Sequence, residues 1–493
     1  MRSFSSIYIA YIFCIILTMT SCRKQFDINI NPSVVTNPPI NTVMPNVTVN
    51  LAFAGGNELL RFPGLWVQQY AAQGNAGNQL RLVENYIVQG SDLISVWATL
   101  YANLLIDNEY ILSNSADHPY YNGIARIIKA WTFQHIVDMW GDVPFTEALN
   151  LSAIPNPSFD DDALIYPAIV ILLDEGIAQL SKEPTGMIPG SDELIYNGNR
   201  QKWIRLANTL KMRIAIHYSE IDPGYTKSVI NTLVDAGAPV IDDNDYNFQM
   251  PFVDAPNAQN PIHQFEFRRP NQLFPNAFLV DMMNERSDPR RAFYLTPYPY
   301  LSQPATYKGA APGDAQAFNY SRFHTYLRGS LKNNPASQPD GSLSPLAAQY
   351  TGAAPIRLLT AAEYFFIRAE ASLRFGATGD AEELLRTAIR KSMEEVGVEE
   401  ASIGEYLAAH GNLIGTQEEQ LEQIIGEKYI ALYGVALEPY NDWRRTGYPA
   451  IEKVPNGVLA SIPTIFLYSS HELSGNPKGK QKASLLETVF WDE

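Results

Sequence analysis

Apolar residues recur at spacings of three and four along much of this chain, which predicts amphipathic helices. Between residues 242 and 354 the pattern is lost, and Pro, Asn, Gly and aromatic residues dominate; only 276–284 predicts a short helix there. We therefore predict a mainly α fold with long irregular loops and little β structure. The predicted helices are residues 91–114, 123–140, 165–180, 202–217, 360–375, 380–393 and 417–434.

Two of these helices form a hairpin in the sequence pattern. Residues 360–375 and 380–393 are joined by the glycine-bounded turn 376–379, and the pair has roughly the 34-residue length of a tetratricopeptide repeat (TPR). Ala369 and Ala371 are small enough to let two helices approach closely. Because the repeat is not sustained, we predict TPR-like helical hairpins that form a scaffold, and no regular solenoid.

The N-terminus carries an export signal. Arg2 is followed by an apolar run from Ile7 to Met19, which is too short to span a membrane and is typical of a secretory leader. Small residues precede Cys22, as in lipoprotein signals; a plain leader followed by an incidental cysteine is the alternative. The other cysteine, Cys14, lies within the leader, so the mature chain has no disulfide framework. We therefore predict lipidation at Cys22.

The domain prediction follows from these patterns. Residues 1–21 form a lipoprotein signal peptide that is removed, and residues 22–39, polar and rich in Asn and Pro, form an extended tether. Residues 40–493 form a single helical domain with an irregular, loop-rich insertion at about 242–354.

Composition narrows the function. The chain has a formal net charge of −16 and no Lys/Arg-rich block, which argues against a nucleic-acid partner. It contains 27 Tyr and 33 Pro. Tyrosine offers a large amphipathic contact surface, and proline stiffens loops, so both favour loops that present a binding surface.

Signals for catalysis are weak. Glu363 and Glu370 share a helix face and could form a glycosidase pair, but paired structural acids are far commoner. The chain has no nucleophile elbow, phosphate-binding loop or dinucleotide fingerprint. The sequence therefore predicts a protein that is not an enzyme and has no catalytic residues.

Signals for a metal are weak too. His217 and Glu220 have ligand-compatible spacing on a predicted helix but no third partner nearby. The acidic stretches 160–162 and 242–245 could hold calcium, although neither has EF-hand spacing and solvated turns are the default. We predict no cofactor and no metal site, with calcium as the alternative.

Four motifs in order give the chain a family resemblance. Residues 125–147 form a long helix that ends in Trp-Gly-Asp-Val-Pro, and 357–371 carry Arg-Ala-Glu-Ala. Residues 427–449 contain Trp-Arg-Arg-Thr-Gly-Tyr-Pro, and the segment after Cys22 has a short Asn-Pro opening. Together they resemble the SusD/RagB family, the outer-membrane nutrient-binding lipoproteins that cap TonB-dependent transporters, and they do so over essentially the whole mature chain.

The motif residues themselves have a structural interpretation. Asp442, Arg444 and Arg445 flank a tryptophan and could clamp a ligand. Pairing of an arginine with helix-end carbonyls or with a buried acid such as Glu363 or Glu370 is favoured. Trp140 and Gly141 are most simply a core side chain and a helix stop.

The resemblance implies a TPR-like α-helical body at the outer-membrane surface, over the mouth of a SusC-like β-barrel. It implies capture of glycans, or of peptides in some members, for import. One departure concerns outward display: many exported members have acidic residues after the lipidated cysteine, whereas Arg23 and Lys24 are basic here. We expect a lipid-anchored protein that faces the cell surface.

Two regions combine aromatic rings, which cover the C–H faces of sugars, with planar amide or guanidinium groups that bond to hydroxyls. The first candidate region is Trp66, Gln68, Tyr70, Gln73, Trp97 and Tyr101, and the second is Arg268, Tyr298, Tyr300, Tyr307, Tyr320 and Arg322. Helical spacing also allows Trp97 and Tyr101 to be core residues.

A peptide or another nutrient bound on the same scaffold is the alternative to a glycan ligand. An enzyme is the least favoured function.

Overall fold

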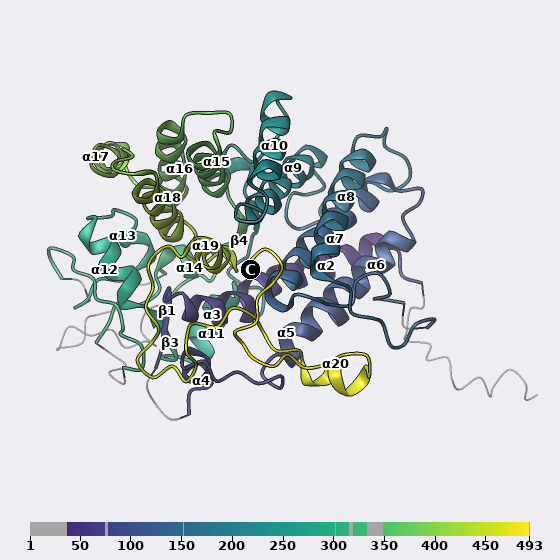
Figure 1. Cartoon of the computed structure of the whole chain (residues 1–493), viewed down its shortest axis with the longest axis horizontal. Coiled ribbons are helices and arrows are strands. Elements are labelled where there is room, and N and C mark those ends of the chain that lie inside the picture. Colours follow the sequence, from purple (N-terminus) through teal and green to yellow (C-terminus); the bar gives the residue numbers. More distant parts are fainter. Residues whose placement is uncertain are drawn as a thin grey trace, which may run out of the picture.

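Antiparallel helices form the larger part of the protein in the computed structural model (Figure 1). The structure describes residues 37–73, 77–150, 152–300, 302–314, 319–332 and 349–492. The predicted signal peptide, Cys22 and most of the predicted tether lie outside these residues. The mainly α fold expected from the sequence is confirmed, because the described strands form only two short pairs.

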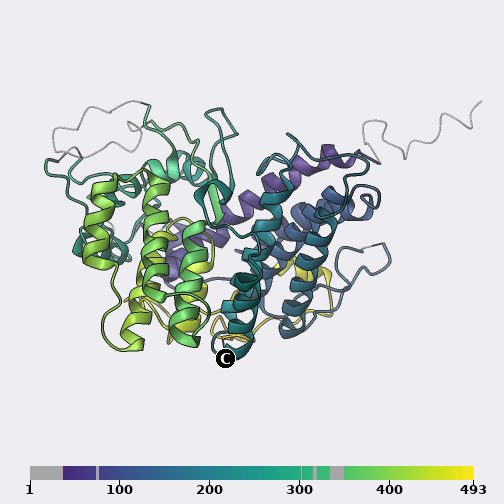
Figure 2. The same ribbon diagram turned by 90° about the horizontal axis from the view of Figure 1, so that it is seen from above.

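The hairpin helices stand side by side in two groups (Figure 2). In the first group α7 packs on α8, α8 on α9 and α9 on α10; in the second α15 packs on α16 and α18. Contacts of α15 with α9 and α10 join the groups. The helices are α7 (Pro119–Trp140), α8 (Asp162–Leu180), α9 (Arg200–His217), α10 (Pro223–Asp235), α15 (Ala361–Phe375), α16 (Ala381–Val396), α17 (Glu400–His410) and α18 (Gln417–Ala431).

Among the described helices, α8 alone has the length and apolar composition to cross a membrane. A third of its apolar window is buried in the fold. Ile165, Ile169 and Leu173 lie on its buried side, so α8 is a packed member of the hairpin layer.

N-terminal helices pack beneath the hairpins. The helix α2 (Ile40–Gly56), purple in Figure 2, runs obliquely across the molecule and is followed by α3 (Glu58–Trp66) and α4 (Gln79–Glu84). The predicted helix at 91–114 consists of α5 (Ile94–Ala98), the π-helical segment η1 (Thr99–Leu105) and α6 (Ile106–Ser113). The helix α2 is not among the helices predicted from apolar spacing, because it is apolar on most sides and contains Pro45.

Two antiparallel strand pairs tie distant segments together. In one pair Tyr70 lies opposite Pro275, and in the other Phe248 lies opposite Leu359. The strands are β1 (Tyr70–Ala72), β2 (Phe248–Met250), β3 (Leu273–Pro275) and β4 (Ile356–Leu359).

All described elements between residues 242 and 354 are short, and only α12 was predicted from the sequence. Besides β2 and β3 they are η2 (Asn244–Tyr246), α11 (Pro261–Arg268), α12 (Ala277–Glu285), α13 (Arg291–Tyr294) and α14 (Thr325–Arg328).

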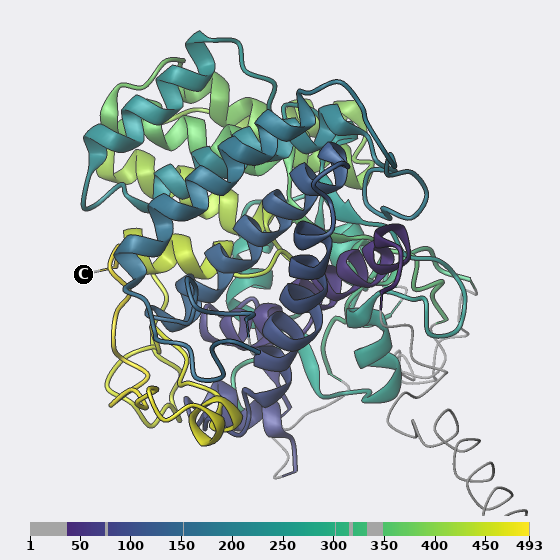
Figure 3. The same cartoon turned by 90° about the vertical axis from the view of Figure 1, so that its right-hand side faces the viewer.

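The C-terminal segment, yellow in Figure 3, runs along the N-terminal helices. It contains α19 (Glu438–Thr446) and α20 (Ser470–Gly475). The backbone N–H of Val458 donates to Asn85, and that of Ser470 donates to Gly90. Trp491, near the chain end, is fully buried. The two ends of the described chain therefore share one core.

Buried ion pairs connect the family-like motifs to this core. Arg445 of α19 donates to both carboxylate oxygens of Glu370 on α15. Arg213 of α9 bonds Glu363 at 2.6 and 2.7 Å. The structural interpretation of Arg445 is thereby confirmed, and neither glutamate is exposed to a substrate. The helix α7 ends at the buried Trp140, and Gly141 follows with a φ of 65°.

Candidate functional site

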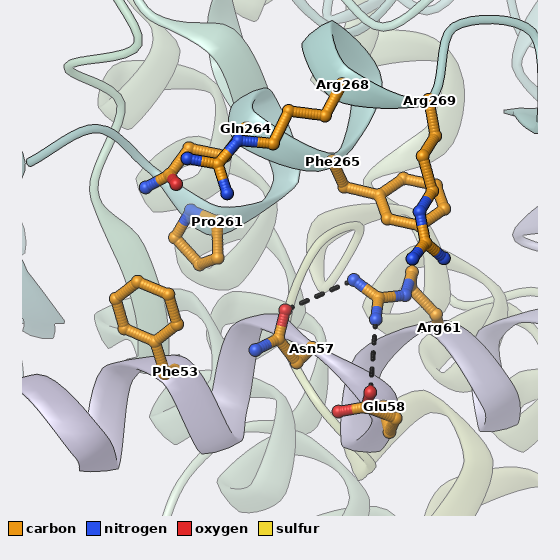
Figure 4. A pocket seen from close by; sticks show the side chains of 9 residues that line it. All are labelled: Phe53, Asn57, Glu58, Arg61, Pro261, Gln264, Phe265, Arg268 and Arg269. Carbon is orange, nitrogen blue, oxygen red and sulfur yellow. Dashed lines mark hydrogen bonds and ion pairs between the residues drawn. The ribbon is translucent and has the colours of Figure 1, made fainter. Parts of the chain in front are cut away.

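A groove of about 260 Å³ opens between the α2–α3 corner and α11 (Figure 4). A second hollow of about 370 Å³ adjoins it and shares Glu58, Arg61, Phe265 and Arg269. We call the two together the arginine groove. The first hollow is also lined by Phe53, Asn57, Pro261, Gln264 and Arg268, and the second by Phe62, Gln79, Leu80, Ser91, Asp92, Ile94, Ser95 and Gln272.

Glycines at the end of α2 allow the wall of the groove to close. A Cβ at Gly56 would lie 2.5 Å from Cγ of Pro261 and 2.9 Å from Cδ1 of Ile356. A Cβ at Gly55 would lie 2.4 Å from Leu358. Because such separations are far inside van der Waals contact, only glycine lets α2 approach α11 and β4 this closely.

The helix α11 is fixed at both ends. Asn260 caps its first turn by accepting from the N–H groups of Ile262 and His263, and its own amide donates to the carbonyl of Ala354. Near the other end, Glu266 is buried and ion-paired with Arg322. Arg322, predicted as a ligand contact, is itself buried and holds α11 in position.

Arginine side chains converge on one aromatic ring in the groove. The guanidinium carbon of Arg61 lies 4.4 Å from the centre of the Phe265 ring, and that of Arg269 lies 5.9 Å from it. Figure 4 shows both guanidinium groups beside this ring, turned toward the same space. Cations in such positions are attracted by the negative face of the ring.

Arg61 is buried and only partly paired. It donates to Asn57 at 3.2 Å and lies 3.5 Å from the carboxylate of Glu58, while its Nε has no partner. Burial lowers the pKa of Arg61 from its ordinary value, Glu58 raises it, and Arg269 lowers it further. The guanidinium group therefore lacks part of the compensation that a buried charge requires.

Most of the first predicted region lies in the core. Trp66 is fully buried, packs against Tyr440 and Phe466, and donates its indole N–H to Val83. Tyr70 packs against Phe323 and Tyr433. Their burial removes both rings from any surface that a ligand can reach.

The rest of that region is also engaged in packing. Trp97 stacks on Tyr101 at 4.7 Å, and the Tyr101 hydroxyl donates to a backbone carbonyl, so the core reading applies to both. Gln68 is buried and donates to Glu452. Gln73 is half-buried and bonds through its backbone to Gln272, which lines the arginine groove.

The second predicted region is divided between separate places. Arg268 lines the arginine groove and donates to Asn257 at 3.2 Å. Tyr298 and Tyr320 flank the ammonium group of Lys308, which lies 5.7 and 5.1 Å from their ring centres. Tyr298 is half-buried and Tyr320 is buried.

Two further tyrosines lie outside that pair. Tyr300 is buried, and Tyr307 is half-buried beside the guanidinium group of Arg291. Of the twelve predicted ligand contacts, Arg268 alone lines the arginine groove as the structure describes it. A role of the half-buried Tyr298 and Tyr307 in binding stays a prediction.

The structure does not bring together His217 and Glu220, the pair whose spacing was compatible with a metal. His217 is buried and faces Glu438 at 3.3 Å and the Tyr166 hydroxyl at 2.8 Å, whereas Glu220 pairs with Arg374. His217, Glu438 and Asp138 could meet around an ion, but Arg213 already lies 3.6 Å from Glu438. This cluster therefore has the character of a buried ion-pair network.

The acidic stretch 160–162 is used mainly in turns. Asp160 accepts from the backbone of Phe145 and Thr146, and Asp161 caps α8. Asp161, Asp162 and Asp142 offer oxygens within 4.8 Å of one another. In the other stretch, Asp243 pairs with Lys391 and caps η2. Calcium at either place stays the untested alternative.

The groove residues that the sequence analysis missed come from three segments. Arg61 is a lone charge in the apolar run from Leu59 to Phe62, and such a charge is a usable signal. Phe265 and Arg269 flank the predicted Arg268, yet nothing in the sequence pairs them with Arg61, some 200 residues away. Their meeting depends on the tertiary fold.

Comparison with known proteins finds one matching family and several solved structures with a similar fold. A SusD-like family profile, described as starch-binding associating with outer membrane, matches residues 32–468. A SusD homologue from Bacteroides uniformis is 22% identical, with a TM-score of 0.75 over 92% of this chain and 99% of that one. A chitin-binding SusD homologue from Flavobacterium johnsoniae is 21% identical, with a TM-score of 0.73 over 92% and 98%.

A SusD/RagB family protein from Bacteroides thetaiotaomicron is 20% identical, with a TM-score of 0.73 over 92% of this chain and 99% of that one. No match to a curated protein was found. At these identities the solved structures establish a shared fold, and the family profile establishes the relationship in sequence.

Proposed function

The chain belongs to the SusD-like family, and from that premise we propose that it binds glycans at the outer membrane and delivers them to a SusC-like TonB-dependent transporter. The lipid on Cys22 would hold it to the membrane surface, where it faces outward. The family consists of binding proteins, and the proposal accordingly assigns no reaction to the chain.

The composition of the arginine groove carries the proposal. A site for an oligosaccharide combines an apolar ring with a few fixed polar groups. Phe265 supplies the ring, and Asn57 and Gln264 supply planar amides on opposite walls of the groove. The chitin-binding relative from Flavobacterium johnsoniae shares the fold that positions these walls, which supports a carbohydrate as the ligand.

Calorimetry on residues 23–493 would test the proposal. The soluble protein is titrated with neutral and acidic oligosaccharides and, separately, with a peptide mixture. We expect heat with at least one oligosaccharide, and a loss of about tenfold or more in affinity on Phe265→Ala, because one well-packed contact residue contributes a kilocalorie or more.

A matched variant controls for the loss of a phenylalanine. Phe267 lies on the same helix, is 67% exposed and does not line the groove, so Phe267→Ala should bind as the parent does. Equal affinity of the parent and Phe265→Ala, together with lost binding in Tyr298→Ala with Tyr300→Ala, would move the site to the 295–323 segment. Heat with peptides alone would refute the glycan proposal.

A further inference from the structure

The arginine groove has a charge opposite to that of the protein as a whole. The chain carries a formal net charge of −16. The first hollow nevertheless contains three guanidinium groups, from Arg61, Arg268 and Arg269, and one carboxylate, from Glu58. A cleft with one sign of charge and low-dielectric walls concentrates ligands of the opposite sign.

The guanidinium groups of the groove have donors to spare. Arg61 is 8% exposed, and its Nε has no hydrogen-bond partner. Arg268 bonds to the neutral side chain of Asn257. Within the described part of the chain, Arg269 has its ring contact with Phe265 and no ion pair. Elsewhere in the same structure, Arg213, Arg290 and Arg445 are each paired with carboxylates.

These three buried arginines thus have close carboxylate partners, whereas buried Arg61 has only Glu58, at 3.5 Å, and Arg268 and Arg269 have no ion pair within the described part of the chain. We propose that an acidic group of the bound glycan, a carboxylate or a sulfate ester, completes the pairing between Arg61 and Arg269. This inference rests on the glycan-binding function proposed above and specifies its substrate class as anionic sugars.

The geometry suits such a group. Guanidinium groups bind planar carboxylates through two parallel hydrogen bonds and bind sulfate oxygens in the same way. The ring of Phe265 lies beside both arginines, so the apolar face of the same sugar can rest against it. Gln264 and Asn57 remain for the hydroxyl groups.

Calorimetry with matched sugars would test the proposal. The probes are oligogalacturonate and its methyl ester, and a heparin oligosaccharide and its desulfated form. We expect at least one probe to bind about tenfold or more tightly than its methyl-esterified or desulfated counterpart, because hydrogen bonds between charged groups are stronger than those between neutral ones. Preference for the uronate identifies a carboxylate ligand, and preference for the heparin fragment alone identifies a sulfate.

Arginine variants connect the preference to the groove. Arg269→Gln and Arg268→Gln replace exposed side chains, so the fold should persist while affinity for the acidic probe falls about tenfold. Arg390→Gln is the control, because Arg390 is partly exposed on α16 and pairs with Glu400 outside the groove. Binding of the acidic probe should also weaken as salt screens the charges.

Failure of this inference is distinguishable from failure of the proposed function. Equal affinity within both probe pairs, or full affinity in both groove variants, would overturn the anionic preference and leave glycan binding in place. Absence of heat with every oligosaccharide would overturn both.

Discussion

Arg445 and Arg61 are both buried, but their surroundings differ. Arg445 of α19 bonds to Glu370 and Asp442. Arg374, which lies on α15 together with Glu370, also contacts Glu370. Arg61 has a single carboxylate at 3.5 Å. A buried charge is stable when it is paired with opposite charge, and Arg445 has two carboxylate partners, so it acts as an internal connection between α15 and α19.

Arg445→Met should destabilise the protein by about 3 kcal/mol, because Glu370 is left buried with Arg374 as its remaining cationic partner. Urea unfolding would measure this loss. Arg390→Met, at a partly exposed pair on α16, should change the unfolding free energy by less than about 0.5 kcal/mol. A second change, Glu370→Gln, should restore part of the loss. Equal effects at the two arginines would contradict the assignment.

Glu84 should make the unfolding free energy of the protein depend on pH. It is fully buried and accepts from the backbone N–H groups of Ala72 and Gly313. Burial raises the pKa of Glu84 to about 7, and these two hydrogen bonds oppose the rise. Since the unfolded carboxyl titrates near 4.5, the folded state binds more protons between about pH 4.5 and 7.

The contribution of Glu84 to stability should therefore fall as pH rises through that interval. The unfolding free energy of the parent minus that of Glu84→Gln should decrease by up to about 1.4 kcal/mol per pH unit. Urea unfolding at several pH values would measure this difference. The contributions of the other titrating groups cancel in it, because the parent and the variant share them. A difference that is constant with pH would refute the raised pKa.

Residue types alone misassigned several side chains. Trp66, Tyr70 and Trp97 were candidates because aromatic rings bind sugars, yet rings also fill cores, and all three are buried; Tyr101 is half-buried and stacks on Trp97. The pairing of Arg445 with a buried acid was predicted correctly, because a buried guanidinium group requires such a partner. Aromatic rings are common in two environments, the core and a sugar-binding surface, whereas a buried arginine is common in one, beside an acid.

At the scale of elements, the position of α11 decides the shape of the groove. Pro261 rests on Gly56, Asn260 caps the first turn, and Glu266 pairs with Arg322. Its own cap and contacts from two distant segments therefore hold a helix of eight residues, which is too short to be stable by itself.

Gly56→Ala should displace α11, since the added methyl group would overlap Pro261 and Ile356. We expect a loss of about 1–3 kcal/mol in unfolding free energy and weaker glycan binding. Gly404→Ala in α17 is the control: its Cβ would meet nothing within 4 Å, and alanine favours a helix. Full affinity in Gly56→Ala would show that the groove does not depend on this contact.

Long amphipathic helices were predictable, and the short elements were not. The helices α7, α9 and α15 have several turns, so their apolar spacing is visible in the sequence. The helix α11 and the strands β1 to β4 have three to eight residues each, and neighbours rather than local pattern stabilise them. Because one wall of the groove is the short helix α11, its location could not be predicted.

At the scale of the whole molecule, Cys22 is the proposed attachment to the membrane. Cys22→Ser should leave the folded body intact, because all described elements lie after residue 36, and should release the protein from the membrane fraction. Fractionation of cells and labelling with a radioactive fatty acid would measure both effects. Label retained in the Cys22→Ser protein would contradict lipidation at this residue.

The assembly of the groove from distant segments has a thermodynamic consequence. Arg61 and Arg269 are about 200 positions apart in the chain, so the site exists only when the tertiary structure is complete. A ligand that binds there selects the native state over every partly folded one, and at a hundred times its dissociation constant it adds about 2.7 kcal/mol to stability. Thermal denaturation can therefore serve as a ligand assay for this protein, even before its natural glycan is known.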